Sequence, residues 1–155
     1  MTTTLTPYMS FPGTTRDVFA FYEQALGAKI VAMMRYADMP EQPASGEGCG
    51  DAGARPTGDA IMHACLAIPG GAMLMAGDVP PGLPDPGIHG VMLALQYDTV
   101  DEAASAFDAL GRGGTVTMPM APAFWAKSFG MLTDRFGVSW AVNGEPIPIP
   151  SPSAS

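Results

Sequence analysis

One histidine inside an apolar stretch is the residue of this sequence best suited to chemistry. His63 lies in the alternating segment 59–68, which predicts a β-strand. Because side chains alternate along a strand, His63 shares one face with Ile61, Cys65 and Ala67. An imidazole there can act as a general base, anchor a ligand by a hydrogen bond, or be a satisfied interior group. We take His63 as the candidate catalytic and ligand-binding residue, with the interior role as the alternative.

Tyr8 is expected to accompany this histidine. Residues 5–11 predict a first strand, in which Thr6, Tyr8 and Ser10 face one side and apolar residues face the other. The register of that strand turns Tyr8 toward the same cavity as His63, where it supplies a second polar group. We therefore predict Tyr8 as a ligand-binding residue.

Aromatic side chains gather between residues 124 and 140, a stretch that contains both tryptophans of the chain. We predict that Phe124 and Trp125 end one strand and that residues 129–133 form the next. Trp125, Phe129 and Met131 are the predicted apolar wall of a ligand cavity, and ordinary core packing is the alternative.

Two further residue types have structural interpretations. Asp134 begins the sequence Asp-Arg-Phe-Gly, which predicts a tight turn into a strand from Val138, so Asp134 is expected to be a turn residue rather than a catalyst. Cys65 has no cationic neighbour in sequence and is expected to be a small buried hydrophobe. Cys49 and Cys65 form no CxxC pair, which fits a reducing cytoplasm.

The elements that carry these residues follow the order β-α-β-β-β twice. Thr14 or Thr15 is the predicted cap of the first helix, and Thr99 with Glu102 forms a predicted capping box for the second. The predicted elements are strand 5–11, helix 16–26 and strands 28–36, 59–68 and 72–77, then strand 89–97, helix 100–110 and strands 114–120, 129–133 and from 138 onward.

The chain length and the positions of the Gly- and Pro-rich segments indicate one domain. We predict a single domain over residues 1–144, with modules at about 5–78 and 88–144, and a disordered Pro- and Ser-rich tail over 145–155. Residues 37–58 form a long loop without apolar periodicity, of the kind that serves as a lid, a partner contact or a mobile segment.

The charge balance excludes one class of partner. The 155 residues carry a net charge of −8, and their seven basic residues are scattered, which argues against nucleic-acid binding. The acidity favours a cationic ligand, or else it simply keeps the surface soluble. No signal peptide and no membrane span are predicted, so we expect a soluble cytoplasmic protein without a membrane partner.

Several segments resemble a known family. The repeated βαβββ order, LTPYMSF, VFAFYEQALGAKI, GGTVTMP and FWAKSFGMLTDRFGVSWAVN are similar to the vicinal oxygen chelate (glyoxalase/bleomycin-resistance/dioxygenase) superfamily, PhnB-like branch, also described as a 3-demethylubiquinone 3-methyltransferase-like domain. The resemblance covers nearly all of residues 5–144. It implies an α+β fold in which each module curls a mixed sheet into half of an open barrel around a cavity.

The resemblance also identifies where a metal would be held. Metal enzymes of this superfamily place His or Glu ligands on the first and last strand of each module. The corresponding residues here are Thr6, Met73 or Met75, Met92 and Ala141. None of them is a usual ligand of a divalent ion, so we expect no metal and no other cofactor. A nucleotide-type methyl donor is not expected either, because no Gly-rich loop follows the first strand.

Two functions are compatible with these observations. The first is a metal-independent small-molecule binding protein of the glyoxalase/bleomycin-resistance type, with an aromatic or cationic ligand in a curled-sheet cavity. The alternative is an enzyme of the same superfamily, of lyase, thiol transferase or dioxygenase type, with His63 as acid or base. The resemblance further implies a homodimer.

Overall fold

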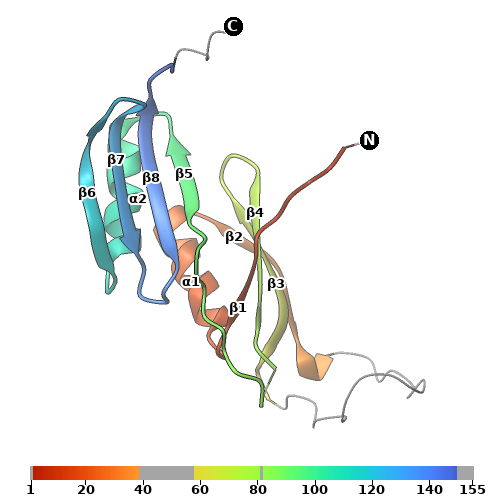
Figure 1. The fold of residues 1–155 in the computed structure, drawn as a ribbon. Coiled ribbons are helices and arrows are strands. Elements are labelled where there is room, and N and C mark those ends of the chain that lie inside the picture. The colour runs from red at the N-terminus through yellow and green to blue at the C-terminus, as the bar shows by residue number, and fades with distance from the viewer. Residues whose placement is uncertain (1, 39–57, 81, 150–155) are drawn as a thin grey trace, which may run out of the picture. The chain divides into compact units, whose positions relative to one another are not determined.

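The computed structural model describes residues 2–38, 58–80 and 82–149. The chain divides into two compact units, Met1–Gly87 (unit one) and Ile88–Ser155 (unit two). Within the described residues each unit has one four-stranded mixed sheet and one α-helix (Figure 1). The predicted α+β fold of two βαβββ modules with open sheets is therefore confirmed. Most of the predicted 37–58 loop lies outside the described residues.

Unit one follows the predicted order of elements. They are β1 (Tyr8–Phe11), α1 (Thr15–Leu26), β2 (Lys29–Arg35), the 3-10 turn η1 (Tyr36–Asp38), β3 (Ile61–Ile68) and β4 (Ala72–Asp78). The strands lie side by side in the order β1-β4-β3-β2. β1 runs parallel to β4, whereas β3 is antiparallel to both of its neighbours.

Helix α1 packs on one face of this sheet. Its apolar residues recur at helical spacing and are buried, as are the facing strand residues Leu66, Leu74 and Ala76. Each fully buried Leu or Phe side chain contributes about 1.5–3 kcal/mol. We call the other face of the sheet the open face of unit one. Tyr8, which alternates with the buried Met9 along β1, lies on it.

The start of α1 differs from the prediction. Thr14 occupies the N-cap position, but its side chain makes no capping hydrogen bond. Instead the carboxylate of Asp78, at the end of β4, accepts hydrogen bonds from the backbone N–H of Thr15 at 3.0 Å and of Ile61 at 2.8 Å. Asp78 is 6% exposed, so a single buried carboxylate joins the start of the helix to the start of β3.

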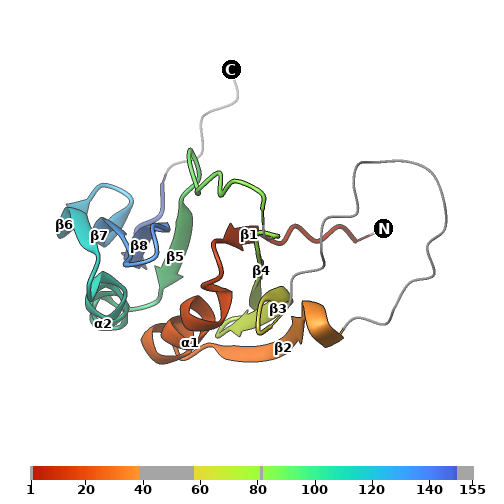
Figure 2. The same cartoon turned by 90° about the horizontal axis from the view of Figure 1, so that it is seen from below.

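Unit two repeats the topology. Its elements are β5 (Leu93–Tyr97), α2 (Val100–Gly111), β6 (Thr115–Ala123), β7 (Ala126–Thr133) and β8 (Ser139–Pro146), with strand order β5-β8-β7-β6. Helix α2 covers one face of this sheet, as Figure 2 shows. The Oγ1 of Thr99 accepts the backbone N–H of Glu102 at 3.2 Å, which confirms Thr99 as the cap.

Several boundaries in unit two were predicted wrongly, among them the start of β7, which lies at Ala126 rather than at residue 129. Phe124 and Trp125 form the turn between β6 and β7 rather than the end of a strand, because β6 continues through Pro122. Proline is tolerated there since β6 is the edge strand of its sheet. The strand predicted from residue 89 begins only at Leu93, after Gly90 with φ of 69°.

The end of β8 is a further difference. The strand runs to Pro146, past the predicted domain boundary at residue 144. Ala126 of β7 pairs with Pro146, whereas the pairing with β5 ends at Gly144. Proline fits at this end because β8 has only one neighbour there. The backbone N–H of Ile147 also bonds the carbonyl of Trp125 at 2.8 Å, and residues 150–155 lie outside the described residues.

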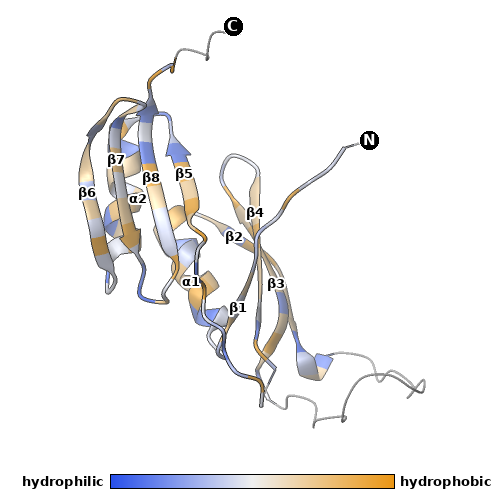
Figure 3. Ribbon diagram, in the orientation of Figure 1, coloured by the Kyte–Doolittle hydropathy of each residue, from blue (hydrophilic) through white to orange (hydrophobic). Residues whose placement is uncertain are grey.

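The distribution of apolar residues agrees with this layered arrangement. Figure 3 shows apolar and polar segments interleaved along the strands of both sheets. Among the described residues, no helix has the length and apolar character needed to cross a membrane.

Candidate functional site

Tyr8 and His63 meet on the open face of unit one. Their ring centroids are 5.7 Å apart with an interplanar angle of 24°, a stacked arrangement. The hydroxyl oxygen of Tyr8 lies 3.4 Å from Nδ1 of His63 and 3.2 Å from the carbonyl oxygen of Met62. Tyr8 is 54% exposed and His63 is half-buried. The structure thus brings the two residues together as the sequence predicted, whereas their role in binding or catalysis stays a prediction.

The register of the sheet explains which side chains surround this pair. Tyr8 pairs with Met75, Met75 pairs with Cys65, and His63 pairs with Met34. Side chains of directly paired residues lie on the same face of a sheet. The open face therefore carries two aromatic rings with polar atoms among thioethers and a buried thiol.

Gly77 makes the contact between the two rings possible. A Cβ atom at this position would lie 2.5 Å from the carbonyl oxygen of Met62 and 3.0 Å from the hydroxyl oxygen of Tyr8. Because glycine has no side chain, the Tyr8 ring can extend across β4 toward β3. Sequence analysis missed this residue, although a glycine inside an apolar strand is a signal of close approach.

The phenols near the site keep their protons. Burial raises the pKa of Tyr8 above its ordinary value, and the neighbouring Tyr36 adds to the shift. Burial also raises the pKa of Tyr36, with a further contribution from the Asp78 carboxylate. The Tyr36 hydroxyl donates to the backbone carbonyl of Asp78 at 3.2 Å. Both phenols are hydrogen-bond donors at neutral pH.

A second cluster lies in unit two. The ring of Trp125 makes an edge contact with Phe129, with centroids 5.0 Å apart and an interplanar angle of 71°. Its indole N–H donates to Oδ1 of Asn143 at 2.9 Å. Phe129 pairs with Asn143, and Met131 pairs with Ala141 on the same face. We call this face, opposite α2, the open face of unit two.

The predicted wall residues Trp125, Phe129 and Met131 are thus brought together, and they share their face with Asn143. Asn143 was missed by sequence analysis, although alternation along β8 from the buried Trp140 and Val142 places it on the open face. Tyr8 and His63 belong to unit one, and the three wall residues belong to unit two. The role of the three wall residues in ligand binding stays a prediction.

Asp134 is a turn residue, as predicted. Its Oδ1 accepts the backbone N–H groups of Phe136 at 2.9 Å and Val138 at 3.1 Å, and its Oδ2 accepts the indole N–H of Trp140 at 2.9 Å. Asp134 is 4% exposed and Trp140 is buried under α2. The two tryptophans of the aromatic stretch therefore separate, one into the core and one onto the open face.

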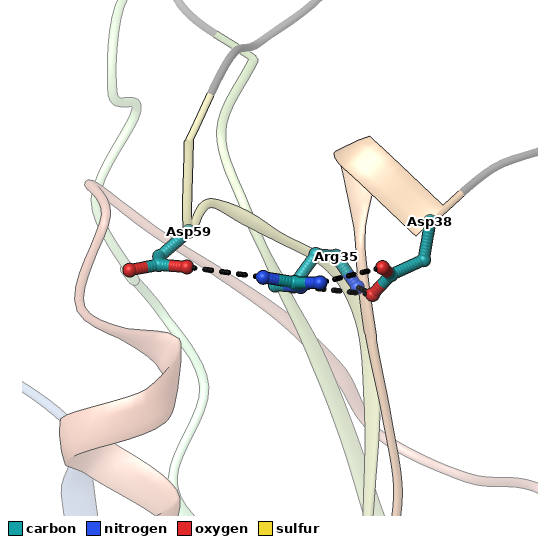
Figure 4. A network of polar contacts seen from close by, with 3 residues as sticks. All are labelled: Arg35, Asp38 and Asp59. Carbon is teal, nitrogen blue, oxygen red and sulfur yellow. Dashed lines mark hydrogen bonds and ion pairs between the residues drawn. The ribbon is translucent and has the colours of Figure 1, made fainter.

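A cavity of about 360 Å³ lies at the start of α1, away from the Tyr8–His63 pair. Its acidic side chains include Asp59 and Asp78, both of which are already engaged. Asp78 holds two backbone N–H groups, and Asp59 accepts from Arg35 at 3.3 Å. Figure 4 shows Arg35 between Asp59 and Asp38, with Asp38 accepting from two guanidinium nitrogens at 2.7 and 2.9 Å. Because the Arg35 network is exposed to solvent, its ion pairs are weak and give no sign of a ligand site. We therefore do not assign the cavity as the functional site.

The residues at the superfamily's metal positions do not fit a divalent ion. Ala141 and the thioethers of Met73 and Met75 offer no hard donor, and Thr6 and Met92 lie just before β1 and β5. Over residues 2–38, 58–80 and 82–149, no group of three or more His, Cys, Asp or Glu side chains could hold a metal.

Comparison with known proteins agrees with the fold. Protein YjdN of Escherichia coli (strain K12) is 35% identical over 140 residues, which cover 90% of this chain and 93% of that protein. The crystal structure of protein PA1353 from Pseudomonas aeruginosa is 43% identical, with a TM-score of 0.76 over 92% of this chain and 97% of the other.

A third match is in fold alone. The putative 3-demethylubiquinone-9 3-methyltransferase, PhnB protein, from Bacillus cereus is 24% identical, with a TM-score of 0.67 over 91% of this chain and 98% of the other. Residues 5–142 match the family model of the Glyoxalase/Bleomycin resistance protein/Dioxygenase superfamily. The chain belongs to this superfamily.

Proposed function

We propose that this chain is a metal-independent binding protein for small aromatic molecules, which it takes up on the open face of unit one. The observation that carries the proposal is the stacked Tyr8–His63 pair, which combines ring surface with two polar groups. Ligand sites are typically apolar with a few polar groups that fix the orientation of the ligand.

The surroundings of the pair support this assignment. Met34, Met73 and Met75 are partly exposed on the same face, and thioether side chains adapt to ligands of different shape. The net charge of −8 favours a neutral or cationic ligand over an anion. The lack of His, Asp, Glu or Cys ligands at the superfamily's metal positions supports binding without a metal.

Titration with aromatic compounds tests the proposal. A screen by calorimetry is expected to find a ligand, and His63→Ala is expected to weaken its binding about tenfold, equivalent to ~1.4 kcal/mol. His89→Ala is the matched control, because His89 is exposed and lies outside both clusters. If His63→Ala binds as tightly as the native chain, His63 is an interior residue and the proposal is wrong.

The aromatic cluster of unit two is tested separately. We propose that Trp125 binds an aromatic ligand on the open face of unit two, and we expect quenching of tryptophan fluorescence to be lost in Trp125→Ala. Trp140 remains as an internal reference, because it is buried and held by Asp134. Full quenching in Trp125→Ala would exclude Trp125 from the ligand site.

An enzymatic function is the second candidate. The Tyr8 hydroxyl lies 3.4 Å from an imidazole nitrogen of His63, and catalytic hydrogen bonds are often this long before a substrate binds, so His63 with Tyr8 fits acid–base chemistry. Metal analysis of the purified protein separates the two candidates. Stoichiometric zinc, iron or manganese would favour a metal-dependent enzyme and contradict the proposed function.

We also propose that the protein is a cytoplasmic homodimer. Cys65 is a free thiol, a state that a reducing compartment preserves. The edge strands β2 and β6 expose apolar side chains, including Val31, Val116 and Met118, which a second copy can cover. Light scattering that shows a monomer at micromolar concentration would remove the dimer.

A further inference from the structure

The hydroxyl group of Tyr8 has two neighbours but only one proton. Its oxygen lies 3.2 Å from the carbonyl oxygen of Met62 and 3.4 Å from Nδ1 of His63. A carbonyl can only accept a hydrogen bond, whereas an imidazole nitrogen accepts or donates according to its tautomer. The shorter contact to Met62 therefore uses the phenol proton.

The backbone geometry supports this assignment of the proton. The pairing of β3 with β4 ends at Ala64 and Ala76, before Met62 is reached. One residue before Met62, the backbone N–H of Ile61 donates to the Asp78 side chain rather than to a backbone carbonyl. The Met62 carbonyl lies at this gap, close to Gly77, where the Tyr8 hydroxyl reaches it. Burial also raises the pKa of Tyr8, so the phenol retains the proton that it donates.

We propose that Tyr8 holds neutral His63 in the tautomer with a proton on Nδ1, so that Nε2 is a hydrogen-bond acceptor for the ligand. With its own proton given to Met62, the Tyr8 oxygen offers only lone pairs to Nδ1, and Nδ1 must therefore donate. An acceptor at Nε2 selects ligands that carry an O–H or N–H group. This inference rests on the proposed function, and it narrows the ligand class to phenols and aromatic N–H compounds.

The same arrangement disfavours carbonyl ligands. A quinone offers acceptors only, and facing the lone pair of Nε2 it would cover that acceptor without giving it a partner. A phenol of the same size satisfies it. Tyr8 thus acts as a positioning residue, because it sets the donor pattern of His63 through Nδ1.

Nitrogen NMR of the full chain tests the tautomer. Long-range proton–nitrogen spectra distinguish a protonated ring nitrogen from an unprotonated one, and the chain has two histidines, so His89→Gln assigns the signals. At a pH about two units above the ordinary imidazole value, we expect a protonated Nδ1 and an unprotonated Nε2 in the native chain. In Tyr8→Phe, which keeps the ring and removes the hydroxyl, the population should shift toward the Nε2–H tautomer. Nε2–H in the native chain, unchanged by Tyr8→Phe, would overturn the inference.

Calorimetry with matched probes tests the selectivity. We expect 2-naphthol to bind the native chain about tenfold more tightly than 2-methoxynaphthalene or 1,4-naphthoquinone, and this ratio to fall in Tyr8→Phe. Equal affinity for the three probes would refute the selectivity while leaving the binding function intact. If none of them binds, the proposed function fails along with the selectivity, and the NMR result alone decides the tautomer.

Discussion

The open faces of the two units share one strand topology but carry their polar side chains on different strands. One sheet row in unit one contains Tyr8, Met75, Cys65 and Ala32, and the corresponding row in unit two contains Ala94, Ala141, Met131 and Met118. Alignment of these rows matches His63 with Phe129 and Gly77 with Asn143. Unit one therefore has polar side chains on the first and third strands of the module, at Tyr8 and His63, whereas unit two has Asn143 on the fourth.

Because of this difference in the position of the polar side chains, the same strand topology gives the two open faces different chemical groups. In unit one the fourth strand is bare at Gly77, so Tyr8 can cross it and reach His63. In unit two the fourth strand carries Asn143, which accepts a hydrogen bond from the indole N–H of Trp125. The open face of unit one thus presents a phenol beside an imidazole, whereas that of unit two presents an amide and aromatic rings.

The faces that carry the helices differ in a related way. The same alignment matches Asp78 with Gly144. Asp78 caps α1 from the sheet, whereas Gly144 lets α2 approach so closely that a Cβ would lie 2.7 Å from that of Ala103. Helix α2 is capped instead by its own Thr99. In unit two the buried carboxylate is instead that of Asp134, in the turn between β7 and β8.

The largest expected effect comes from removal of these carboxylates. Asp134→Asn replaces an anion that accepts three N–H groups by an amide with one acceptor, so we expect a loss of about 3 kcal/mol in unfolding free energy. Asp78→Asn should cost about 2 kcal/mol, because its carboxylate accepts two N–H groups. Urea unfolding measures both losses.

Asp108→Asn is the control for this pair, because Asp108 is exposed on α2. It should leave the stability unchanged. If Asp78→Asn and Asp134→Asn also unfold like the native chain, the two carboxylates are not the anchors of their units.

Insertion of a single methyl group at Gly77 tests why the open faces differ. Gly77→Ala places a Cβ 2.5 Å from a backbone oxygen that cannot turn away, so we expect a loss of about 1–3 kcal/mol. The variant should also separate the Tyr8 hydroxyl from His63. Gly111→Ala is the matched control, since the nearest atom to its Cβ lies at an ordinary 3.8 Å. Equal stability of the two variants would contradict the role assigned to Gly77.

The sequence predicted the fold because its signals were local. Alternation and helical spacing predicted both βαβββ modules, and Thr99 with Glu102 predicted the second cap. It missed the cap of α1, because Asp78 lies 63 positions along the chain from Thr15. The β6–β7 turn was misplaced because Phe124 and Trp125 were predicted to end a strand, and only the edge position of β6 explains why that strand tolerates Pro122.

The candidate site was predictable only in part, for the same reason. Alternation placed Tyr8 and His63 on one face, and it grouped Phe129 with Met131. It could not indicate that Gly77 leaves room for the Tyr8 ring or that Asn143 accepts from Trp125, because these contacts depend on the register between strands.

A smaller effect is expected from the amide of unit two. Asn143→Ala removes the acceptor of the Trp125 indole, which is partly buried, so we expect a loss of about 1 kcal/mol. The fluorescence of Trp125 should also change, because its ring loses the bond that orients it. Trp125→Phe in the Asn143→Ala background is the control, since the second substitution should then cost less than it does alone. Additive losses would show that the bond contributes nothing to stability.

The smallest effect is expected at the Arg35 network of unit one, in which Arg35 pairs with Asp38 and Asp59 at the surface. Hydrogen bonds from Arg35 lower the pKa of Asp38 below its ordinary value. A carboxyl whose pKa is lower in the folded state stabilises the fold above its unfolded pKa of about 4. That stabilisation is lost as the pH falls through the lower folded value.

We therefore expect the stability of Arg35→Gln to depend slightly less on pH than that of the native chain, at pH values below the unfolded pKa of Asp38. Because both partners are exposed, added salt should reduce the difference between Arg35→Gln and the native chain. Parallel acid titrations of unfolding at low and high salt measure this, and a difference that salt does not change would show that Arg35 acts through packing rather than through its charge.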